Sequence, residues 1–255
     1  MIERPSPNHE PRPSGKAIDM LVLHYTGMAD TGEALRRLCA PAAKVSAHYL
    51  IDEDGAVYRL VAEDRRAWHA GVASWAGETD INGISIGIEL ANPGHDHGYR
   101  DFPEAQMAAL IDLAGGIVRR HGIPAARVLG HSDVAPHRKL DPGEKFDWKR
   151  LAAAGIGLWP EVSGPPAGGA DFGPGDTDPV IAETQTALAR FGYDLEATGI
   201  LDVRTTLVLA AFHRHFRPRR IDGRLDAETR AILSALIALL PHPALRADLS
   251  RGGEV

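Results

Sequence analysis

The segment from His131 to Asp141 gathers, in one short loop, side chains that could bind a metal ion. It follows the apolar pair Val128-Leu129 and has an imidazole at its start and a carboxylate at its end. A second histidine, His24, ends another apolar run at residues 20–23. Two imidazoles and one carboxylate are a ligand set of catalytic zinc, which needs three protein donors and an open fourth position for water. These residues therefore predict a zinc hydrolase.

The alternative for each ligand is an ordinary structural role. A lone histidine after an apolar strand, such as His24, is more often a core imidazole than a ligand. His131 and Asp141 favour the metal site, because both lie at strand ends or in loops, where sites are built. Zinc is favoured over magnesium or calcium, which prefer mostly oxygen ligands. His95 and His97, in a glycine-rich loop, are weaker candidates.

A zinc hydrolase also needs a base for its water and a positive group for the developing oxyanion. Glu89 lies near the end of the otherwise apolar strand at 84–90. A carboxylate is costly to bury there, so we expect a raised pKa and a catalytic role; the alternative is a solvent-facing glutamate on an edge strand. Lys139, two positions before Asp141, is the candidate cation, and its alternative is a solvated loop lysine.

Five further residues are predicted to contact substrate from the wall of the pocket. Two of them are histidines within the short motifs Ser46-Ala-His-Tyr49 and Trp68-His-Ala-Gly71. The predicted set is His48, Tyr49, Trp68, His69 and Asn92.

Alternating strand-like and helix-like patterns in the first part of the chain predict an α/β fold. Strands are expected at residues 18–24, 48–61 (a hairpin), 84–90 and 128–129. Helices are expected at residues 32–39, 103–121 and 146–154. Asp54-Gly55 supplies the left-handed turn of the hairpin, and Gly122 ends the long helix. This order implies a central mixed sheet flanked by helices.

Composition then divides the chain into two domains. Residues 1–159 form the predicted catalytic domain, and residues 160–177 are a Pro/Gly-rich linker. Residues 178–245 are a small three-helix domain with an internal repeat, Gly-x-Leu-Asp-x-x-Thr, at Gly199 and at Gly223. The aspartate of each copy can cap the helix that follows, so the repeat is primarily structural.

Length, charge and composition limit the classes of partner and the locations that we expect. The chain has 255 residues and a net charge of -6, so nucleic acid is not an expected partner. Cys39 is the only cysteine, which excludes an internal disulfide. No apolar run is long enough for a transmembrane segment, and no signal peptide is visible. The expected location is the cytoplasm, with the periplasm or cell envelope as the alternative.

The motifs resemble those of the zinc-dependent N-acetylmuramoyl-L-alanine amidases of the AmpD/AmiD type. The match covers roughly residues 6–155 and includes Leu23-His24-Tyr-Thr, Ser85-Ile-Gly-Ile-Glu89-Leu and Gly130-His131-Ser-Asp-Val-Ala-Pro followed by Lys139-Leu-Asp141-Pro-Gly. The resemblance implies His24, His131 and Asp141 as ligands of one Zn²⁺, Glu89 as acid/base and Lys139 as the stabiliser of the transition state.

The resemblance also implies a substrate. It would be peptidoglycan or a muropeptide, cut between N-acetylmuramic acid, or its 1,6-anhydro form, and L-alanine of the stem peptide. The C-terminal repeat resembles a small peptidoglycan-binding module, although His213 stands where glutamine is usual. Two alternatives stay open: a non-catalytic muropeptide recognition module on the same fold, and a zinc peptidase that cuts within the stem peptide. The sequence has no His-Glu-x-x-His motif, which disfavours the zinc peptidase.

Overall fold

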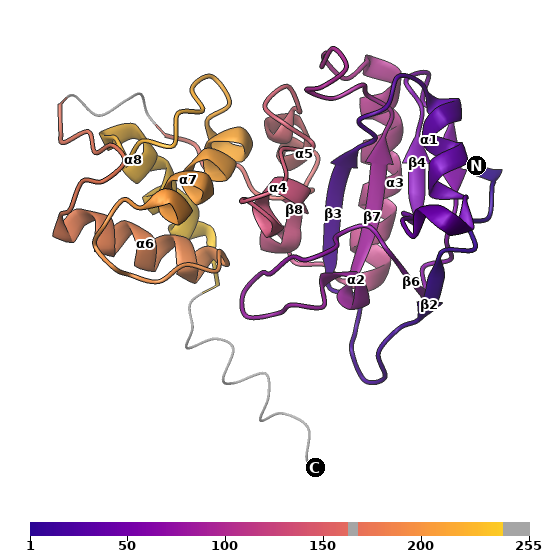
Figure 1. The fold of residues 1–255 in the computed structure, drawn as a ribbon, viewed down its shortest axis with the longest axis horizontal. Helices are drawn as coiled ribbons and strands as arrows, with labels where there is room; N and C mark the ends of the chain where they lie inside the picture. Colours follow the sequence, from indigo (N-terminus) through magenta and orange to yellow (C-terminus); the bar gives the residue numbers. More distant parts are fainter. Residues whose placement is uncertain (163–167, 242–255) are drawn as a thin grey trace.

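The computed structural model describes residues 1–162 and 168–241. It shows an α/β part built on a central sheet and a three-helix module packed against one side of it (Figure 1). None of the helices in these two ranges combines the length and the apolar character that a bilayer crossing requires.

The central sheet has six strands in the order β1-β5-β4-β7-β3-β8. Their bounds are β1 Ile2–Glu3, β3 Met20–Tyr25, β4 Tyr49–Ile51, β5 Val57–Arg59, β7 Ser85–Leu90 and β8 Val128–Gly130. Neighbours among β4, β7, β3 and β8 are parallel, whereas β4 and β5 form an antiparallel hairpin. A separate antiparallel pair joins β2 (His9–Pro11) to β6 (Arg65–Ala67). The predicted fold class, a mixed sheet with helices, is confirmed.

Helices cover both faces of this sheet. They are α1 Thr31–Leu38, α2 Ile81–Ile84, α3 Glu104–His121, α4 His131–Val134 and α5 Trp148–Ala153, with short 3₁₀ turns at Pro41–Ala43 and Ala125–Arg127. The predicted hairpin turn and helix end are confirmed, since Gly55 and Gly122 have φ of 86° and 64°. The strand predicted from residue 84 begins at Ser85 instead, because Asp80 caps the short helix α2 immediately before it.

Alternation along β3 and β7 decides which side chains reach the site. Leu21 and Leu23 of β3, with Ile86 and Ile88 of β7, are buried in one cluster with the apolar residues of α3. Side chains alternate between the two faces of a strand. The residues between and after them, including His24 and Glu89, therefore lie on the opposite face, which α1 partly covers (Figure 1).

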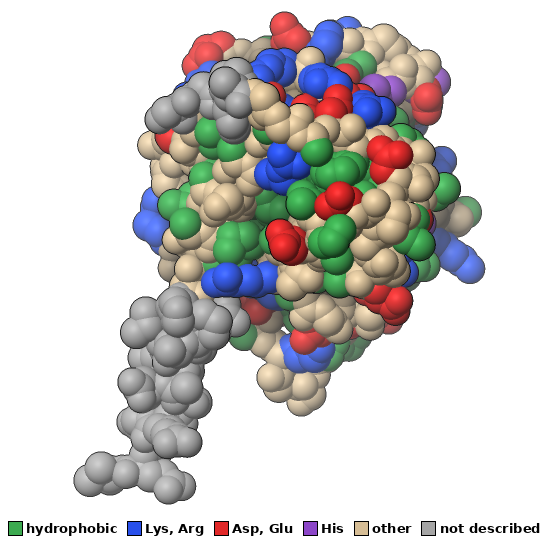
Figure 2. All heavy atoms as spheres, turned by 90° about the vertical axis from the view of Figure 1, so that its left-hand side faces the viewer, with side chains coloured by type: hydrophobic (Ala, Val, Ile, Leu, Met, Phe, Trp, Pro, Cys, Tyr) green, Lys and Arg blue, Asp and Glu red, His purple; other side chains and the backbone are tan. Residues whose placement is uncertain are grey.

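The C-terminal module consists of α6 Pro179–Phe191, α7 Val203–Phe216 and α8 Ala227–Leu239. The aspartates before these helices accept hydrogen bonds from backbone N–H groups of the first turns: Asp178 from Val180, Asp202 from Thr205 and Asp226 from Thr229. The capping role predicted for the repeat is confirmed. In Figure 2 acidic and basic side chains are interspersed on the outer face of the module.

The end of the predicted linker is paired with this module. Phe172 forms an antiparallel bridge with Leu225, and Thr177 forms one with Ile200. The domain boundaries stay predictions; residues 163–167 of the linker and the predicted end of the second domain, 242–245, lie outside the described residues.

An apolar interface joins the module to the α/β part. Trp75 packs edge-on against Phe191 and Tyr193, with ring centroids 5.1 and 4.9 Å apart. The Ala76 N–H donates to the carbonyl of Gly192 at 2.7 Å. A Cβ on Gly192 would lie 2.2 Å from the Trp75 ring, so this position has no room for a side chain.

Gly192→Ala should destabilise the protein through this interface. Gly192 has φ of 147° and abuts Trp75, so we expect a loss of about 1–3 kcal/mol from overpacking in addition to backbone strain. Gly155→Ala is the control, because Gly155 has φ of 78° but nothing near its Cβ position. Urea unfolding measures both, and equal losses would contradict a close-packed interface.

Candidate active site

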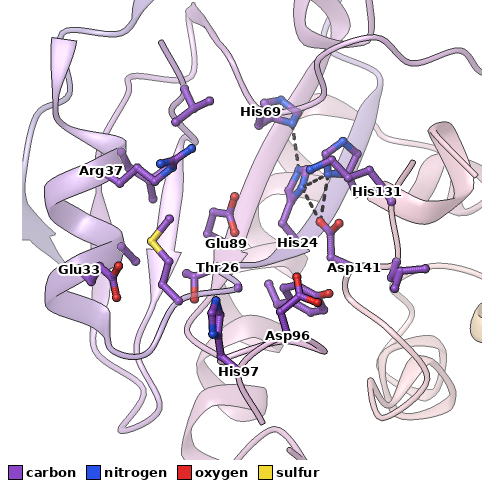
Figure 3. Close-up of a pocket in the computed structure, with 18 of the residues that line it drawn as sticks. His24, Thr26, Glu33, Arg37, His69, Glu89, Asp96, His97, His131 and Asp141 are labelled. Atoms are coloured by element: carbon purple, nitrogen blue, oxygen red, sulfur yellow. Dashed lines mark hydrogen bonds and ion pairs between the residues drawn. The ribbon is translucent and has the colours of Figure 1, made fainter. Parts of the chain in front are cut away.

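A cleft of ≈ 580 Å³ opens where the parallel strands β3, β7 and β8 end. Clefts beyond the carboxyl ends of parallel strands are the usual place for ligands in α/β proteins. Figure 3 shows His24, His131, Asp141 and Glu89 around one space, with Glu33 and Arg37 of α1 across the cleft.

Strand register explains why these residues meet. In the parallel ladder His24 of β3 pairs with Glu89 of β7, and Leu23 pairs with Gly130 of β8, the residue before His131. Three side chains that are far apart in the sequence therefore leave the sheet at neighbouring strand ends. Asp141 returns to the same place because its carbonyl accepts the Ser132 N–H at 2.9 Å.

The donor atoms of His24, His131 and Asp141 form a nearly equilateral triangle. The Nδ1 atoms of His24 and His131 are 2.9 Å apart. Oδ2 of Asp141 lies 3.1 Å from Nδ1 of His24 and 3.0 Å from Nδ1 of His131. All three residues are buried, and they form a group that could hold a metal ion. Ligand atoms arranged tetrahedrally at about 2.0–2.1 Å from a zinc ion lie roughly 3.3 Å from one another. The triangle is therefore close to the size that such an ion needs.

A chain of hydrogen bonds sets the orientation and tautomer of His24. Its Nε2 lies 3.1 Å from Nδ1 of His69, whose Nε2 lies 3.1 Å from Oγ of Ser85. The Ser85 hydroxyl donates to the carbonyl of Ile81 at 2.6 Å. Read back from that carbonyl, His69 donates to Ser85 and His24 donates to His69. The Nδ1 of His24 then presents its lone pair to the triangle, as a metal ligand requires.

Gly87 makes room for this chain. A Cβ on Gly87 would lie 2.5 Å from the His69 ring. A glycine inside a strand often marks such a close approach, so Gly87 was a signal in the sequence that another group packs closely against this strand.

His131 is oriented by its second nitrogen. Its Nε2 lies 3.0 Å from the carbonyl of Ala70, to which Arg138 also donates. A ligating histidine commonly donates its other N–H in this way, which raises the basicity of the ligating atom. Arg138, which also lines the cleft, was not predicted as part of the site.

The electrostatics favour the protonation states that bind a cation. Burial, with the charge of His131, lowers the pKa of His24 to about 4, so its imidazole is neutral at neutral pH. Burial alone would raise the pKa of Asp141, but attraction to His131 lowers it below its usual range.

Glu89 is the one carboxylate of the predicted site that stays without a partner. Its Oε2 is buried and has no hydrogen bond within the described residues. Burial, with the charge of Asp141, raises the pKa of Glu89 well above its usual range, and Lys139 opposes this shift. A carboxyl group with a raised pKa beside a cleft is suited to exchanging protons near neutral pH.

The structure brings only part of the predicted pocket wall to the cleft. Trp68 and His69 line it, whereas His48, Tyr49 and Asn92 do not. Lys139, the predicted cation, also lines the cleft. His48 is fully buried beside His69, where its Nδ1 accepts the Gly87 N–H and its Nε2 contacts Arg12.

Tyr49 and Asn92 also have other roles. The Tyr49 hydroxyl donates to Glu63 at 2.7 Å. Asn92 accepts the Gly94 N–H and donates to the carbonyl of Arg100, which shapes the loop at the cleft rim. His95 and His97 lie on that rim rather than in the donor triangle.

Comparisons with known proteins agree with this geometry. Residues 14–144 match a family model described as "N-acetylmuramoyl-L-alanine amidase". Residues 177–233 match one described as "Putative peptidoglycan binding domain".

Curated relatives include N-acetylmuramoyl-L-alanine amidase AmiD of Escherichia coli, 40% identical over 86% of this chain and 82% of that protein. The 1,6-anhydro-N-acetylmuramyl-L-alanine amidase AmpD of Citrobacter freundii is 36% identical over 58% of this chain and 87% of that protein.

Solved structures of whole chains are also similar. AmiD of Escherichia coli, in complex with anhydro-N-acetylmuramic acid-L-Ala-D-gamma-Glu-L-Lys, aligns with a TM-score of 0.75 at 38% identity, over 89% of this chain and 92% of that one. AmpDh3 of Pseudomonas aeruginosa, in complex with anhydromuramic pentapeptide, aligns with a TM-score of 0.71 at 36% identity, over 88% and 92%.

His24→Ala should abolish tight binding of a divalent metal, because it removes one of three donors. The purified variant, dialysed and analysed for metal content, should hold far less than one equivalent. His137→Ala is the control, since His137 is an exposed histidine of the same loop as His131. Stoichiometric metal in His24→Ala would place the ion elsewhere.

Glu89→Gln should stabilise the metal-free protein increasingly as the pH rises above about 4, up to the raised pKa of the folded state. The carboxyl group ionises near pH 4.3 in the unfolded chain, whereas in the fold its raised pKa shifts ionisation to higher pH. The wild type therefore loses stability relative to the variant as the pH rises through this window. Urea unfolding measures the difference.

The control for this experiment is Glu196→Gln, because Glu196 is exposed. Its effect on the free energy of unfolding should stay flat across the same range. If the effect of Glu89→Gln on the free energy of unfolding is also independent of pH, burial does not raise the pKa of Glu89.

Proposed function

This chain belongs to the N-acetylmuramoyl-L-alanine amidase family, and from this premise we propose that it hydrolyses the amide joining N-acetylmuramic acid to L-alanine of the stem peptide. The resemblance predicted from the motifs is thereby confirmed at the level of the family. The observation that carries the proposal is the buried donor triangle, which lies beside Glu89 at the base of an open cleft.

We propose zinc as the ion, held by Nδ1 of His24, Nδ1 of His131 and the carboxylate of Asp141. Two imidazoles and one carboxylate suit zinc better than magnesium or calcium. Bound there, zinc would supply a Lewis acid that polarises the scissile carbonyl and lowers the pKa of water to about 7. The hydrogen-bond chain through His69 and Ser85 holds His24 in the tautomer that this ligation needs.

The protein's own groups would then move the proton and offset the charge. Glu89 would accept a proton from the attacking water and deliver it to the nitrogen of the leaving L-alanine, since its raised pKa suits both steps. Lys139 lines the cleft, and its positive charge acts to lower the pKa of both Glu89 and His24. Its ammonium would offset the negative charge that develops on the carbonyl oxygen.

The substrate class follows from the relatives whose structures contain anhydromuropeptides. We propose that the cleft accepts N-acetylmuramoyl or 1,6-anhydro-N-acetylmuramoyl peptides, with Trp68 as a wall residue. The cytoplasmic location expected from the N-terminus stays a prediction, as does binding of peptidoglycan by the C-terminal module. His213, the departure from the module's usual glutamine, is fully buried and contacts Thr229, so it alters no surface.

The second candidate is a recognition module that binds muropeptides without cutting them. It keeps the cleft but needs neither the donor triangle nor an unpartnered Glu89. Both are present here, which favours the enzyme.

Glu89→Gln should lower turnover by at least about 100-fold, because it removes a general acid/base, while the metal content stays at that of the wild type. Turnover is measured by release of free stem peptide from a purified muropeptide. Glu33→Gln is the control, since Glu33 lines the cleft from α1 but lies away from the triangle (Figure 3). Full turnover in Glu89→Gln would remove Glu89 from the mechanism.

Digestion of defined substrates tests the function as a whole. The zinc-loaded protein is incubated with intact sacculi and, separately, with anhydromuropeptides, and the products are read by mass spectrometry. From one or both substrates we expect a free peptide that begins with L-alanine. The other product should be the N-acetylmuramic acid part with a free carboxylate in place of the amide. Cleavage inside the stem peptide would indicate a peptidase, and binding without any product would indicate the recognition module.

A further inference from the structure

The three-helix module reaches the metal site through one buried carboxylate, Asp133. Asp133 is the third residue of α4, the short helix that begins at His131. Its Oδ2 accepts the backbone N–H of Gly130 at 2.8 Å and Nδ1–H of His215 at 2.7 Å. Its Oδ1 accepts the hydroxyl of Tyr193, also at 2.7 Å. Two of its three hydrogen bonds therefore come from the module.

A second set of contacts links His215 to the backbone at Gly130. The His215 ring stacks on Trp148 with ring centroids 3.8 Å apart. Trp148 in turn borders Gly130, where an added Cβ would lie 3.3 Å from the Trp148 ring and 2.8 Å from Pro142. Gly130 directly precedes the ligand His131, and Pro142 directly follows the ligand Asp141. His215 thus supports the chain next to two of the three donors.

The α4 turn has little to hold it in place by itself. It spans only His131–Val134, and one turn of helix is unstable without tertiary contacts. Asp133 is almost fully buried, and a buried carboxylate that loses hydrogen-bond donors moves toward water or toward other donors. Either movement would release the Gly130 N–H and shift the start of the turn that carries His131.

We propose that Tyr193 and His215 of the C-terminal module are positioning residues for the metal site, which fix His131 through Asp133 and Gly130. The module is then a structural part of the catalytic unit as well as a candidate wall-binding module. This inference rests on the metal site given under the proposed function.

The test compares zinc affinity in the full-length protein and its variants. Tyr193→Phe and His215→Phe each keep an aromatic ring and remove one donor to Asp133. We expect the zinc dissociation constant, measured by competition with a chelating indicator, to rise by about 10-fold in the double variant and by less in each single one. The visible absorption of the Co²⁺-substituted protein should change in parallel, because it reports ligand geometry.

A rescue variant and a matched control separate positioning from general destabilisation. In His215→Asn the side-chain amide can donate from nearly the place of Nδ1, so zinc affinity should return toward that of the wild type. Thr229→Val removes a buried hydroxyl that bonds to His213 and Asp226 within the module, away from Asp133. It should lower the thermal midpoint and leave zinc affinity and the Co²⁺ spectrum unchanged.

The outcomes are distinct. Wild-type zinc affinity and an unchanged Co²⁺ spectrum in Tyr193→Phe and His215→Phe would overturn the inference, even if both variants melt earlier. If the double variant does not fold, the Tyr193→Phe single variant decides. A wild-type protein that binds no zinc would instead overturn the proposed metal site, and the inference with it.

Discussion

The rest of the site depends on the parallel register of β7, β3 and β8. That register sets Glu89 beside His24 and places Leu23 beside Gly130, one residue before His131. Parallel strands end at the same edge, so three polar side chains leave the sheet together while their apolar neighbours Ile88 and Leu23 stay under α3. A shift by one residue in any of these strands would turn a functional side chain into the core.

Burial around this edge then determines the chemistry. Burial holds the imidazole of His24 neutral and raises the pKa of Glu89, while attraction to His131 lowers the pKa of Asp141. Each imidazole is oriented by its second nitrogen, through His69 for His24 and through the Ala70 carbonyl for His131. The donors are therefore arranged for a cation by contacts outside the triangle itself, which is a general feature of metal sites in proteins.

Much of the α/β fold and the core of the site could be predicted from local patterns. Strand alternation, the Asp54-Gly55 turn and a carboxylate in an apolar strand were sufficient for the strands, the hairpin and Glu89. The predicted wall residues His48 and Tyr49 show the limit. The short motif does not tell that Tyr49 lies on the α3 face of its strand, or that His48 is buried beside His69 and does not reach the cleft. The link from Asp133 to His215 joins residues 82 positions apart, and no spacing rule predicts such a contact between two domains.

The central claim is that one ion is held by donors from two strand ends and a returning loop. Anomalous diffraction at the zinc edge, from crystals of the zinc-loaded protein, tests it most directly. The account predicts one strong peak about 2.0–2.1 Å from Nδ1 of His24, Nδ1 of His131 and a carboxylate oxygen of Asp141. A peak at the rim histidines His95 and His97, or no peak in the cleft, would contradict it.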